Sequence, residues 1–429
     1  MLTLRGGLVA ATGLAVWAVG RVFGAGPLEQ LGVAFIALVA IALAVARLSR
    51  HDLVVDRLIE PHRCHAGQEV AVTLELVNRG KGPAPLILIE DALPCDLATR
   101  ARFAVPGIEA AGRRSLRYSV TPSRRGRYDV GPAKVTFVDP FGLARAESAR
   151  RERSAVLVHP RVHNLALPRD RGRQRSLAVS ALRRPVGLNG EDFYTLREYA
   201  EGDDLRRVHW PSTARSRKYM IRQEEAAWHT RATVLFDDRS QAHEGVGEAS
   251  SFERMIEAAA SLADLYQRSG YSYRLMGASH PGLPHGRRAG HLAACLDLLA
   301  TLEASPDEPR ALAARLAGLD TGAAPEGTLA AVLGGAVDAG SAALLGRLTR
   351  RFSRVIAVLH PPHRFGGRPT RDRWAGEKDA RDVEAVLRRA GVAVIALGPE
   401  DSLATAWGAL SSNQPVGGER EWAPKPELV

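Results

Sequence analysis

Two apolar runs at the start of the sequence constrain its first part more strongly than any other feature. Only two charged residues, Arg21 and Glu29, interrupt residues 6–46. The second run, 30–46, is long enough to cross a bilayer with a modest tilt, and the shorter first run reaches that length if Arg21 extends its side chain to the membrane surface. The FGAGP sequence between the runs predicts a tight turn. We therefore predict that residues 1–50 form two transmembrane helices.

Arginines that follow the second run predict on which side of the membrane the rest of the chain lies. Basic residues accumulate at the cytoplasmic ends of membrane helices, so Arg47, Arg50 and Arg57 place that end in the cytoplasm. Two spans then leave both termini inside, as in a multi-pass protein of the plasma membrane with cytoplasmic domains. The three widely spaced cysteines form no disulfide framework, which fits a reducing compartment. Two alternatives stay open for the first run: a signal peptide cleaved near Gly24-Ala25, or a poorly inserted helix.

Residues 52–165 have the pattern of a β domain. Strand-like segments cover 70–78, 85–91 and 115–122, and turn signals separate them, which predicts a small antiparallel β-sandwich. Asp139-Pro140-Phe141-Gly142 is predicted to be a turn, of a kind that can place its aromatic ring in a core. The sequence HRCH, 62–65, holds metal-ligand types, but no second pair with zinc spacing lies near it. We predict that it starts a strand and holds no metal.

Positive charge is concentrated in the middle of the sequence. The chain has a net charge of +11, and residues 113–184 alone hold 18 Lys and Arg against 5 Asp and Glu. Part of this stretch, 166–186, is interrupted by Pro and Gly and is predicted to be a basic linker. Such a stripe is typical of a surface that faces anionic lipid, or of an ordinary solvated surface. No helix-turn-helix, RNA-binding sheet or zinc-finger pattern accompanies it, so no nucleic-acid partner is predicted.

Residues 231–412 alternate between apolar strands and amphipathic helices. The predicted strands are 231–238, 271–277, 328–335, 354–360 and 391–397. The predicted helices are 250–268, 289–303, 307–318, 338–351, 379–390 and 402–410. Ser250 and Glu253 have the spacing of a capping box at the start of the first helix. This alternation predicts a doubly wound α/β domain whose mainly parallel sheet is covered on both faces. The last residues, 413–429, are rich in Pro, Gly and Glu and predict a flexible tail.

The segment 187–223 interleaves charges, aromatics and glycines more densely than any other part of the sequence. Its centre comprises Arg197, Glu198, Tyr199, Gly202, Asp203, Asp204, Arg206, Trp210, Ser212, Ala214 and Arg215. Together with R-R-G-x-Y, G-P and D-P-F-G-L in 124–143, these signature residues resemble the bacterial family called domain of unknown function 58. With the linker before it, the segment makes up a predicted region 166–230.

The resemblance implies both partners and an architecture. Members of the family are associated with MoxR-type AAA+ ATPases and with membrane transglutaminase-like proteins, which implies an adaptor that docks through its signature. The α/β region is similar to a von Willebrand factor A-like domain, in which a D-x-S-x-S motif after the first strand holds a metal ion. Here Arg239 and Gln241 replace the serines that should follow Asp237, and a motif that starts at Asp238 keeps only Ser240. We therefore predict a degenerate site, with no bound metal and no cofactor.

The signature allows three interpretations from its residue chemistry. Its carboxylates could act as acid and base and Ser212 as a nucleophile, as in a hydrolase or a metal-dependent enzyme. It could be a structural network, with Tyr194, Tyr199 and Trp210 in a core and Gly202-Asp203-Asp204 capping the next helix. It could dock a partner. Because the sequence contains no Walker loop and no H-E-x-x-H or G-x-S-x-G motif, we predict a membrane-anchored, cytoplasm-facing interaction protein that is not an enzyme.

Overall fold

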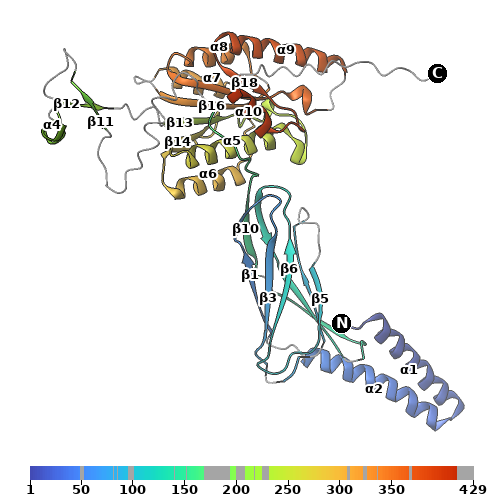
Figure 1. Ribbon diagram of the computed structural model, residues 1–429. Coiled ribbons are helices and arrows are strands. Elements are labelled where there is room, and N and C mark those ends of the chain that lie inside the picture. Colours follow the sequence, from blue (N-terminus) through green and yellow to red (C-terminus); the bar gives the residue numbers. More distant parts are fainter. Residues whose placement is uncertain are drawn as a thin grey trace, which may run out of the picture. The chain divides into compact units, whose positions relative to one another are not determined.

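The computed structural model divides the chain into two compact units, Met1–Pro160 and Arg161–Val429 (Figure 1). The residues that it describes are 1–48, 53–80, 82–84, 86–94, 101–139, 141–150, 152–168, 194–199, 208–216, 218–224, 231–306, 310–321, 326–335, 337–366 and 370–412. The predicted tail, 413–429, and most of the predicted basic linker lie outside this set.

The first unit begins with a helical hairpin. Helix α1 covers Leu4–Phe23, and helix α2 covers Gly26–Leu48. The hydroxyl of Thr3 caps α1 by accepting a hydrogen bond from the backbone N–H of Gly6. The helix ends at Gly24, whose φ of 67° is easily reached only by a residue without a side chain. Both helices are long and apolar enough to cross a membrane, so the predicted pair of apolar N-terminal helices is confirmed.

The two helices approach each other closely along a line of glycines. A methyl group added at Gly13 would lie 2.8 Å from Cβ of Phe35. One added at Gly32 would lie 2.5 Å from the backbone nitrogen of Trp17. Small residues allow the backbones of membrane helices to come together in this way, because lipid offers no hydrophobic force between them. The hairpin is therefore a packed pair.

The described residues of the rest of the first unit form ten short strands in three small sheets. One sheet has the order β1-β3-β6, from strands β1 (Leu53–Glu60), β3 (Val70–Asn78) and β6 (Arg113–Val120). A second has the order β5-β4-β8-β9, from β5 (Ala101–Val105), β4 (Ile87–Asp91), β8 (Ala133–Val138) and β9 (Arg145–Arg150). The third has the order β2-β10-β7, from β2 (Arg63–His65), β10 (Ser154–His159) and β7 (Gly126–Val130). All pairs are antiparallel except β2 with β10.

Alternating burial along the strands creates the core of this unit. In β3 the side chains of Val72, Leu74 and Leu76 are fully buried, whereas Glu75 between them is exposed. Leu74 and Leu76 belong to the same apolar cluster as residues of the second sheet, such as Ile89. The strand predicted at 70–78 is confirmed, and those predicted at 85–91 and 115–122 are each present with a shift of about two residues.

The turn between β8 and β9 attaches the hairpin to the sheets. The carboxylate of Asp139 shapes this turn by accepting hydrogen bonds from the backbone N–H groups of Phe141 and Ala144. The buried apolar residues of the turn are Leu143 and Ala144, which pack against α2 in a cluster with Val39, Ala42 and Ala46. The predicted turn is present, but Phe141 is 62% exposed, so its aromatic ring does not lie in a core.

The second unit contains a six-stranded sheet with the order β15-β14-β13-β16-β17-β18. Its strands are β13 (Arg231–Phe236), β14 (Ser272–Gly277), β15 (Leu283–Gly286), β16 (Glu326–Gly334), β17 (Phe352–His360) and β18 (Ala393–Ala396). Five of them are parallel, at the positions predicted, and the additional strand β15 pairs with β14 in the antiparallel sense. The predicted mainly parallel sheet is thus confirmed.

Helices cover both faces of this sheet (Figure 1). They are α5 (Ser251–Arg268), α6 (Ala289–Thr301), α7 (Ala311–Asp320), α8 (Ala339–Leu348), α9 (Thr370–Arg389) and α10 (Leu403–Ser412). Neighbouring strand residues belong to different cores: Val234 packs with α5, α6 and α10, and Leu235 packs with α7, α8 and α9. The predicted capping box is present, since the Ser250 hydroxyl accepts a hydrogen bond from the N–H of Glu253.

Residues that lead into the second unit pack on the α/β core. Leu165 is buried in the same cluster as α5 and α10. The indole N–H of Trp407 donates a 2.7 Å hydrogen bond to the backbone oxygen of Ala166, and the N–H of His163 donates to the hydroxyl of Ser261. The segment 161–168 therefore contributes to the α/β unit, although the predicted β domain extends to 165.

Candidate functional site

The signature forms a small structure of its own. Strand β11 (Tyr194–Glu198) pairs with β12 (Met220–Glu224) in a two-stranded antiparallel sheet, and helix α4 (Trp210–Ser216) lies between them in sequence. The backbone N–H of Met220 donates to the hydroxyl of Thr213, and its oxygen accepts from the N–H of His209. The start of α4 is thereby tied to the start of β12. We had not predicted either strand, since residues 166–230 read as a linker and a signature.

Aromatic side chains of this small structure face solvent. Trp210 is 64% exposed, Tyr219 is 55% exposed and Tyr199 is 37% exposed. The rings of Tyr199 and Tyr219 meet edge to face, with their centroids 6.3 Å apart. The interpretation in which Tyr199 and Trp210 pack in a core is therefore wrong. Large exposed aromatics that are held in place by backbone hydrogen bonds are typical of surfaces that bind another protein.

Only part of the predicted signature can be placed. Arg197 and Glu198 lie in β11, Tyr199 follows it, and α4 carries Trp210, Ser212, Ala214 and Arg215. Gly202, Asp203, Asp204 and Arg206 lie outside the described residues. The predicted acid–base and helix-capping roles of the two aspartates are therefore not tested.

A histidine and a serine contact each other at the start of α4. Nδ1 of His209 lies 2.9 Å from the Ser212 hydroxyl, and the backbone oxygen of His209 accepts hydrogen bonds from the N–H groups of Ser212 and Thr213. A histidine can activate a serine for nucleophilic attack when a third group orients the histidine. These contacts join residues of one helical turn, which is the arrangement of a helix cap.

The predicted degenerate metal site lies at the carboxyl end of β13. Nε and Nη2 of Arg239 donate hydrogen bonds of 2.7 and 2.8 Å to the two carboxylate oxygens of Asp237, and both residues are buried. The carboxylate of Asp238 accepts hydrogen bonds from the backbone N–H groups of Ser279 and His280. The guanidinium group thus takes the place at which a divalent cation would need oxygen ligands. Within the described residues, no group of three or more His, Cys, Asp or Glu could hold a metal ion.

Two histidines beside this site, His243 and His360, are not among the functional residues predicted from the sequence. His243 is half-buried, with Nε2 2.5 Å from the backbone oxygen of Asp237 and Nδ1 3.2 Å from the hydroxyl of Ser251. Its pKa is lowered, mainly by burial. His360 ends β17 and is fully buried, and neither of its ring nitrogens makes a hydrogen bond of good geometry. His360 could have been found from the sequence, because it is a polar residue at the carboxyl end of the apolar run 354–360. Polar groups of parallel sheets meet at the carboxyl ends of the strands.

Burial makes His360 a source of acid sensitivity. Loss of solvation, helped by the nearby His243, lowers the pKa of His360 from 6.5 to about 3, and an interaction with the Leu333 backbone opposes this only in part. The folded chain therefore keeps this ring neutral, whereas the unfolded chain protonates it below pH 6.5. Stability from this group is complete above pH 6.5 and is lost as the pH falls toward 3.

We expect the second unit to lose about 2 kcal/mol of unfolding free energy between about pH 7 and pH 5, because one proton corresponds to about 1.4 kcal/mol per pH unit. Urea unfolding of wild-type protein and His360→Phe at both pH values measures this. The phenylalanine variant should lose the part of the pH dependence that comes from His360, while the part from His243 remains. It should be no less stable at neutral pH, since it removes an unsatisfied buried polar group. The same acid loss in both proteins would contradict the assignment to His360.

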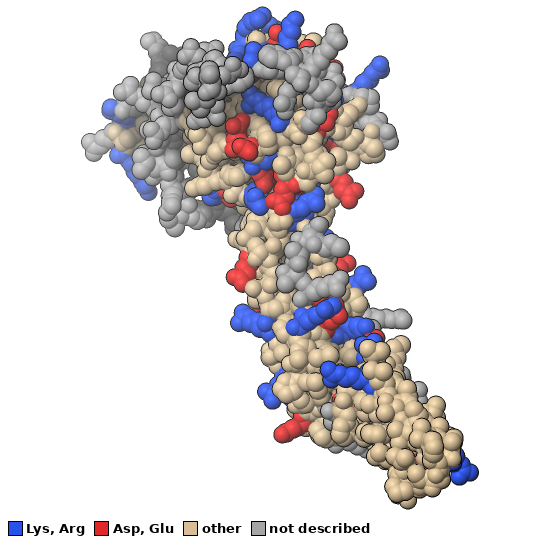
Figure 2. All heavy atoms as spheres, turned by 90° about the vertical axis from the view of Figure 1, so that its right-hand side faces the viewer, with Lys and Arg blue, Asp and Glu red and all other residues tan. Residues whose placement is uncertain are grey.

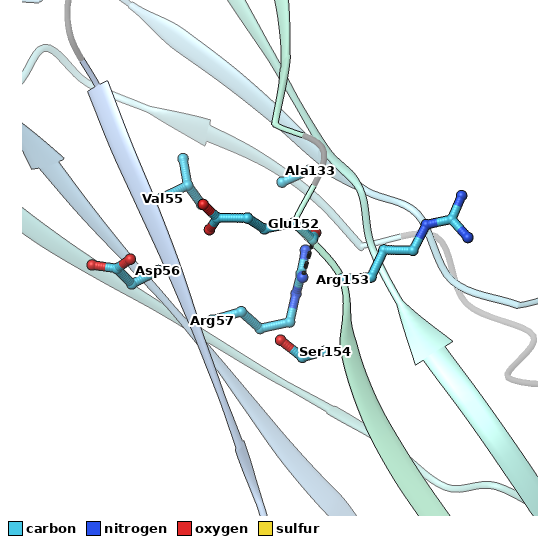
Figure 3. Close-up of a pocket in the computed structure, with 7 residues that line it drawn as sticks. All are labelled: Val55, Asp56, Arg57, Ala133, Glu152, Arg153 and Ser154. Carbon is cyan, nitrogen blue, oxygen red and sulfur yellow. Dashed lines mark hydrogen bonds between the residues drawn. The ribbon is translucent and has the colours of Figure 1, made fainter.

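A pocket of about 280 Å³ opens in the first unit beside a buried ion pair (Figure 3). Arg57 of β1 donates two hydrogen bonds to the carboxylate of Asp91 on β4 and a third to the backbone oxygen of Glu152. The hydroxyl of Tyr118 donates to the same carboxylate, at 2.6 Å. Figure 3 shows Arg57 reaching across to the strand segment of Glu152, whereas Asp56 points the other way. Because Arg57 is already paired, its charge joins two sheets and is not available to attract an anion.

The described residues thus define a chain with two apolar N-terminal helices, several antiparallel sheets and an α/β sheet, to which a short aromatic signature is added. Residues 195–362 match the model of the family described as protein of unknown function DUF58. The matched range includes the described signature residues and strands β13 to β17. This match confirms the resemblance to the family that the signature predicted.

Other comparisons give no functional information. No curated protein matches the chain. Among solved structures, a CARDB domain from Pyrococcus furiosus in complex with di-metal ions has 18% identity and a TM-score of 0.19, and the match covers 25% of this chain and 88% of that one. The C-terminal domain of Wzt has 11% identity and a TM-score of 0.21, with 25% and 74% of the two chains covered. Similarities at this level carry no argument about fold or activity.

Proposed function

We propose that this protein is a membrane-anchored adaptor that faces the cytoplasm and binds a MoxR-type AAA+ ATPase through its signature. The exposed aromatic group of Trp210, Tyr219 and Tyr199 supports the proposal, because hot spots of protein interfaces are rich in such side chains. A membrane transglutaminase-like protein is a second expected partner. The proposal includes no enzymatic activity, no metal or other cofactor and no nucleic-acid partner.

The proposal extends to the finer architecture. We take the second unit as a von Willebrand factor A-like domain, which is supported by its parallel sheet with helices on both faces. We take the sheets of the first unit as a β-sandwich, supported by the core that residues of two of its sheets share. In this interpretation Arg239 replaces the metal ion of the typical domain. The signature, and not a metal site, then binds the partner.

The anchoring part of the proposal predicts a topology. Two helices that cross the plasma membrane would leave both chain ends in the cytoplasm. Arg47 in the last turn of α2 and Arg50, which follows the helix in the sequence, favour that side. A reporter fused after Val429 is expected to be active only if it is a type that works in the cytoplasm. Protease added outside spheroplasts should leave 53–412 intact. Digestion of these residues from outside would contradict the orientation.

The docking part is tested by removing the exposed aromatics. Trp210→Ala combined with Tyr219→Ala should change the free energy of unfolding by only about 0.5 kcal/mol, because both side chains face solvent. The same variant should lose capture of the ATPase when the tagged protein is extracted from membranes. Val246→Ala, which truncates another exposed apolar side chain (94% exposed), is the matched control and should retain capture.

Other outcomes separate docking from catalysis. Unchanged capture by the double variant would contradict docking through this surface. If capture persists while the biological activity is lost, the signature acts in a reaction, and the hydrolase alternative with Ser212 and the signature carboxylates gains support. If the variant loses its stability, the aromatics have a structural role after all.

A further inference from the structure

The turn between β8 and β9 lies at the start of the hairpin. The backbone N–H of Thr3 donates a 2.9 Å hydrogen bond to the oxygen of Leu143, and the N–H of Arg145 donates to the oxygen of Met1. The hydroxyl of Thr3 donates to the oxygen of Gly142. Near the end of α2, Ala42 and Ala46 pack against Leu143. The turn therefore touches both helices at the end where the hairpin joins the sheets.

The lengths of the helices place this end at the edge of a bilayer. At 1.5 Å per residue, the 20 residues of α1 span about 30 Å, which is about the thickness of the hydrocarbon core. Leu4, the first residue of α1, then lies at the boundary of that core, and Thr3 lies just outside it. Phe141 is two residues from Leu143, the partner of Thr3, and two residues extend over at most about 7 Å.

The exposed side chains at this end have the chemistry of a membrane interface. Phe141 is 62% exposed, and Leu2 and Leu4 are 40% and 84% exposed. Arg5 is exposed at the start of α1, and the side chain of Arg145 is half exposed. Figure 2 shows the hairpin as an almost entirely tan surface, with Lys and Arg where it meets the sheets and at its far end.

We propose that the turn 139–144 is a third membrane contact, in which the ring of Phe141 inserts among the lipid headgroups beside the start of α1. Aromatic side chains favour this level of a bilayer, and arginines beside them attract anionic headgroups. Lipid is the occupant favoured over a protein because the surface is continuous with the apolar helices. The inference rests on the proposed membrane anchoring. It gives the D-P-F-G-L segment a role that does not depend on burial of its aromatic ring, which is exposed.

Spin labels on the full chain test this contact in vesicles made of phosphatidylethanolamine and phosphatidylglycerol. Three single variants are labelled: Phe141→Cys, Ile41→Cys on the exposed face of α2, and Gln68→Cys in the turn between β2 and β3. The unmodified protein, treated in parallel with the label, gives the background from its three native cysteines, of which Cys64 and Cys295 are buried. Accessibility to dissolved oxygen and to a water-soluble nickel chelate reports depth in the bilayer.

The label at 141 is expected to be several-fold less accessible to the nickel chelate than the label at 68, and more accessible than the label at 41. Equal nickel accessibility at 141 and 68, with 41 protected, would overturn the contact and leave the anchoring intact. An accessible label at 41 would overturn the anchoring and this inference with it. Protection at 141 that disappears when the protein is diluted in lipid would assign the surface to a second copy of the chain and also overturn the lipid contact.

Discussion

Replacing Asp91 with alanine is expected to lower the free energy of unfolding of the first unit by about 3–5 kcal/mol, because Arg57 would remain buried without its counter-ion. The side chains of Arg57 and Asp91 are 4% and 0% exposed, and Tyr118 would lose the acceptor of its hydroxyl as well. The pocket beside Arg57 gives water a way to reach the guanidinium, which favours the lower end of that range. Urea unfolding in detergent, followed by hydrogen exchange of peptides from β1 and β4, measures the effect on this unit.

A matched control is available in the same pocket. Asp56 precedes Arg57 on β1, lines the pocket and is exposed, so Asp56→Ala should change the free energy of unfolding by at most about 0.5 kcal/mol. Replacing all three members of the network by Arg57→Met, Asp91→Leu and Tyr118→Phe should recover most of the loss, since no buried polar group is then left without a partner. Equal effects of Asp56→Ala and Asp91→Ala on the free energy of unfolding would show that the buried network contributes no specific stabilisation.

Replacing Asp237 with alanine is expected to destabilise the second unit by a similar amount, about 3–5 kcal/mol, because Arg239 would be left buried without its bidentate acceptor. Hydrogen exchange of peptides from β13 and β16 in increasing urea measures the loss. Wild-type protein should show no rise in melting temperature when magnesium is added at about millimolar concentration, since the guanidinium already neutralises the carboxylate.

The double variant Asp237→Leu with Arg239→Met separates the two explanations of this pair. If the pair is structural, the double variant should be much more stable than Asp237→Ala alone, because both charges are removed together. A magnesium-dependent rise in melting temperature that disappears in Asp237→Ala would instead show that the site binds metal and that Arg239 moves aside.

The pattern of apolar residues predicted the elements of the fold that bury an apolar run or stripe. The five parallel strands of the second unit are continuous apolar runs, and each was placed from the sequence to within a few residues. The first part of α9 was missed, since the helix begins at Thr370 and was predicted from 379. Its first residues are mostly charged in sequence and show no apolar stripe, so their helical period could not be seen.

Contacts between distant residues could not be predicted in the same way. Arg57 interrupts the apolar pattern of its strand, but nothing local indicates that Asp91 and Tyr118, on other strands, face it. The pairing of Arg239 with Asp237 was visible only as a departure from a motif. Burial of Phe141, and of Trp210 in one of the three interpretations of the signature, was inferred because a large aromatic is usually buried. Only the surrounding fold decides whether it is.

The hydrogen bonds between residues 1–3 and 142–145 also determine an order of events during synthesis. Thr3 and Leu143 are 140 residues apart in the chain. At about 5–20 residues per second, the ribosome needs on the order of 10 s to make the intervening sequence. In a membrane-inserted chain, the hairpin would therefore enter the bilayer well before its partner turn exists. The β8–β9 turn would then close over helices that are already in place, as a late step of biogenesis.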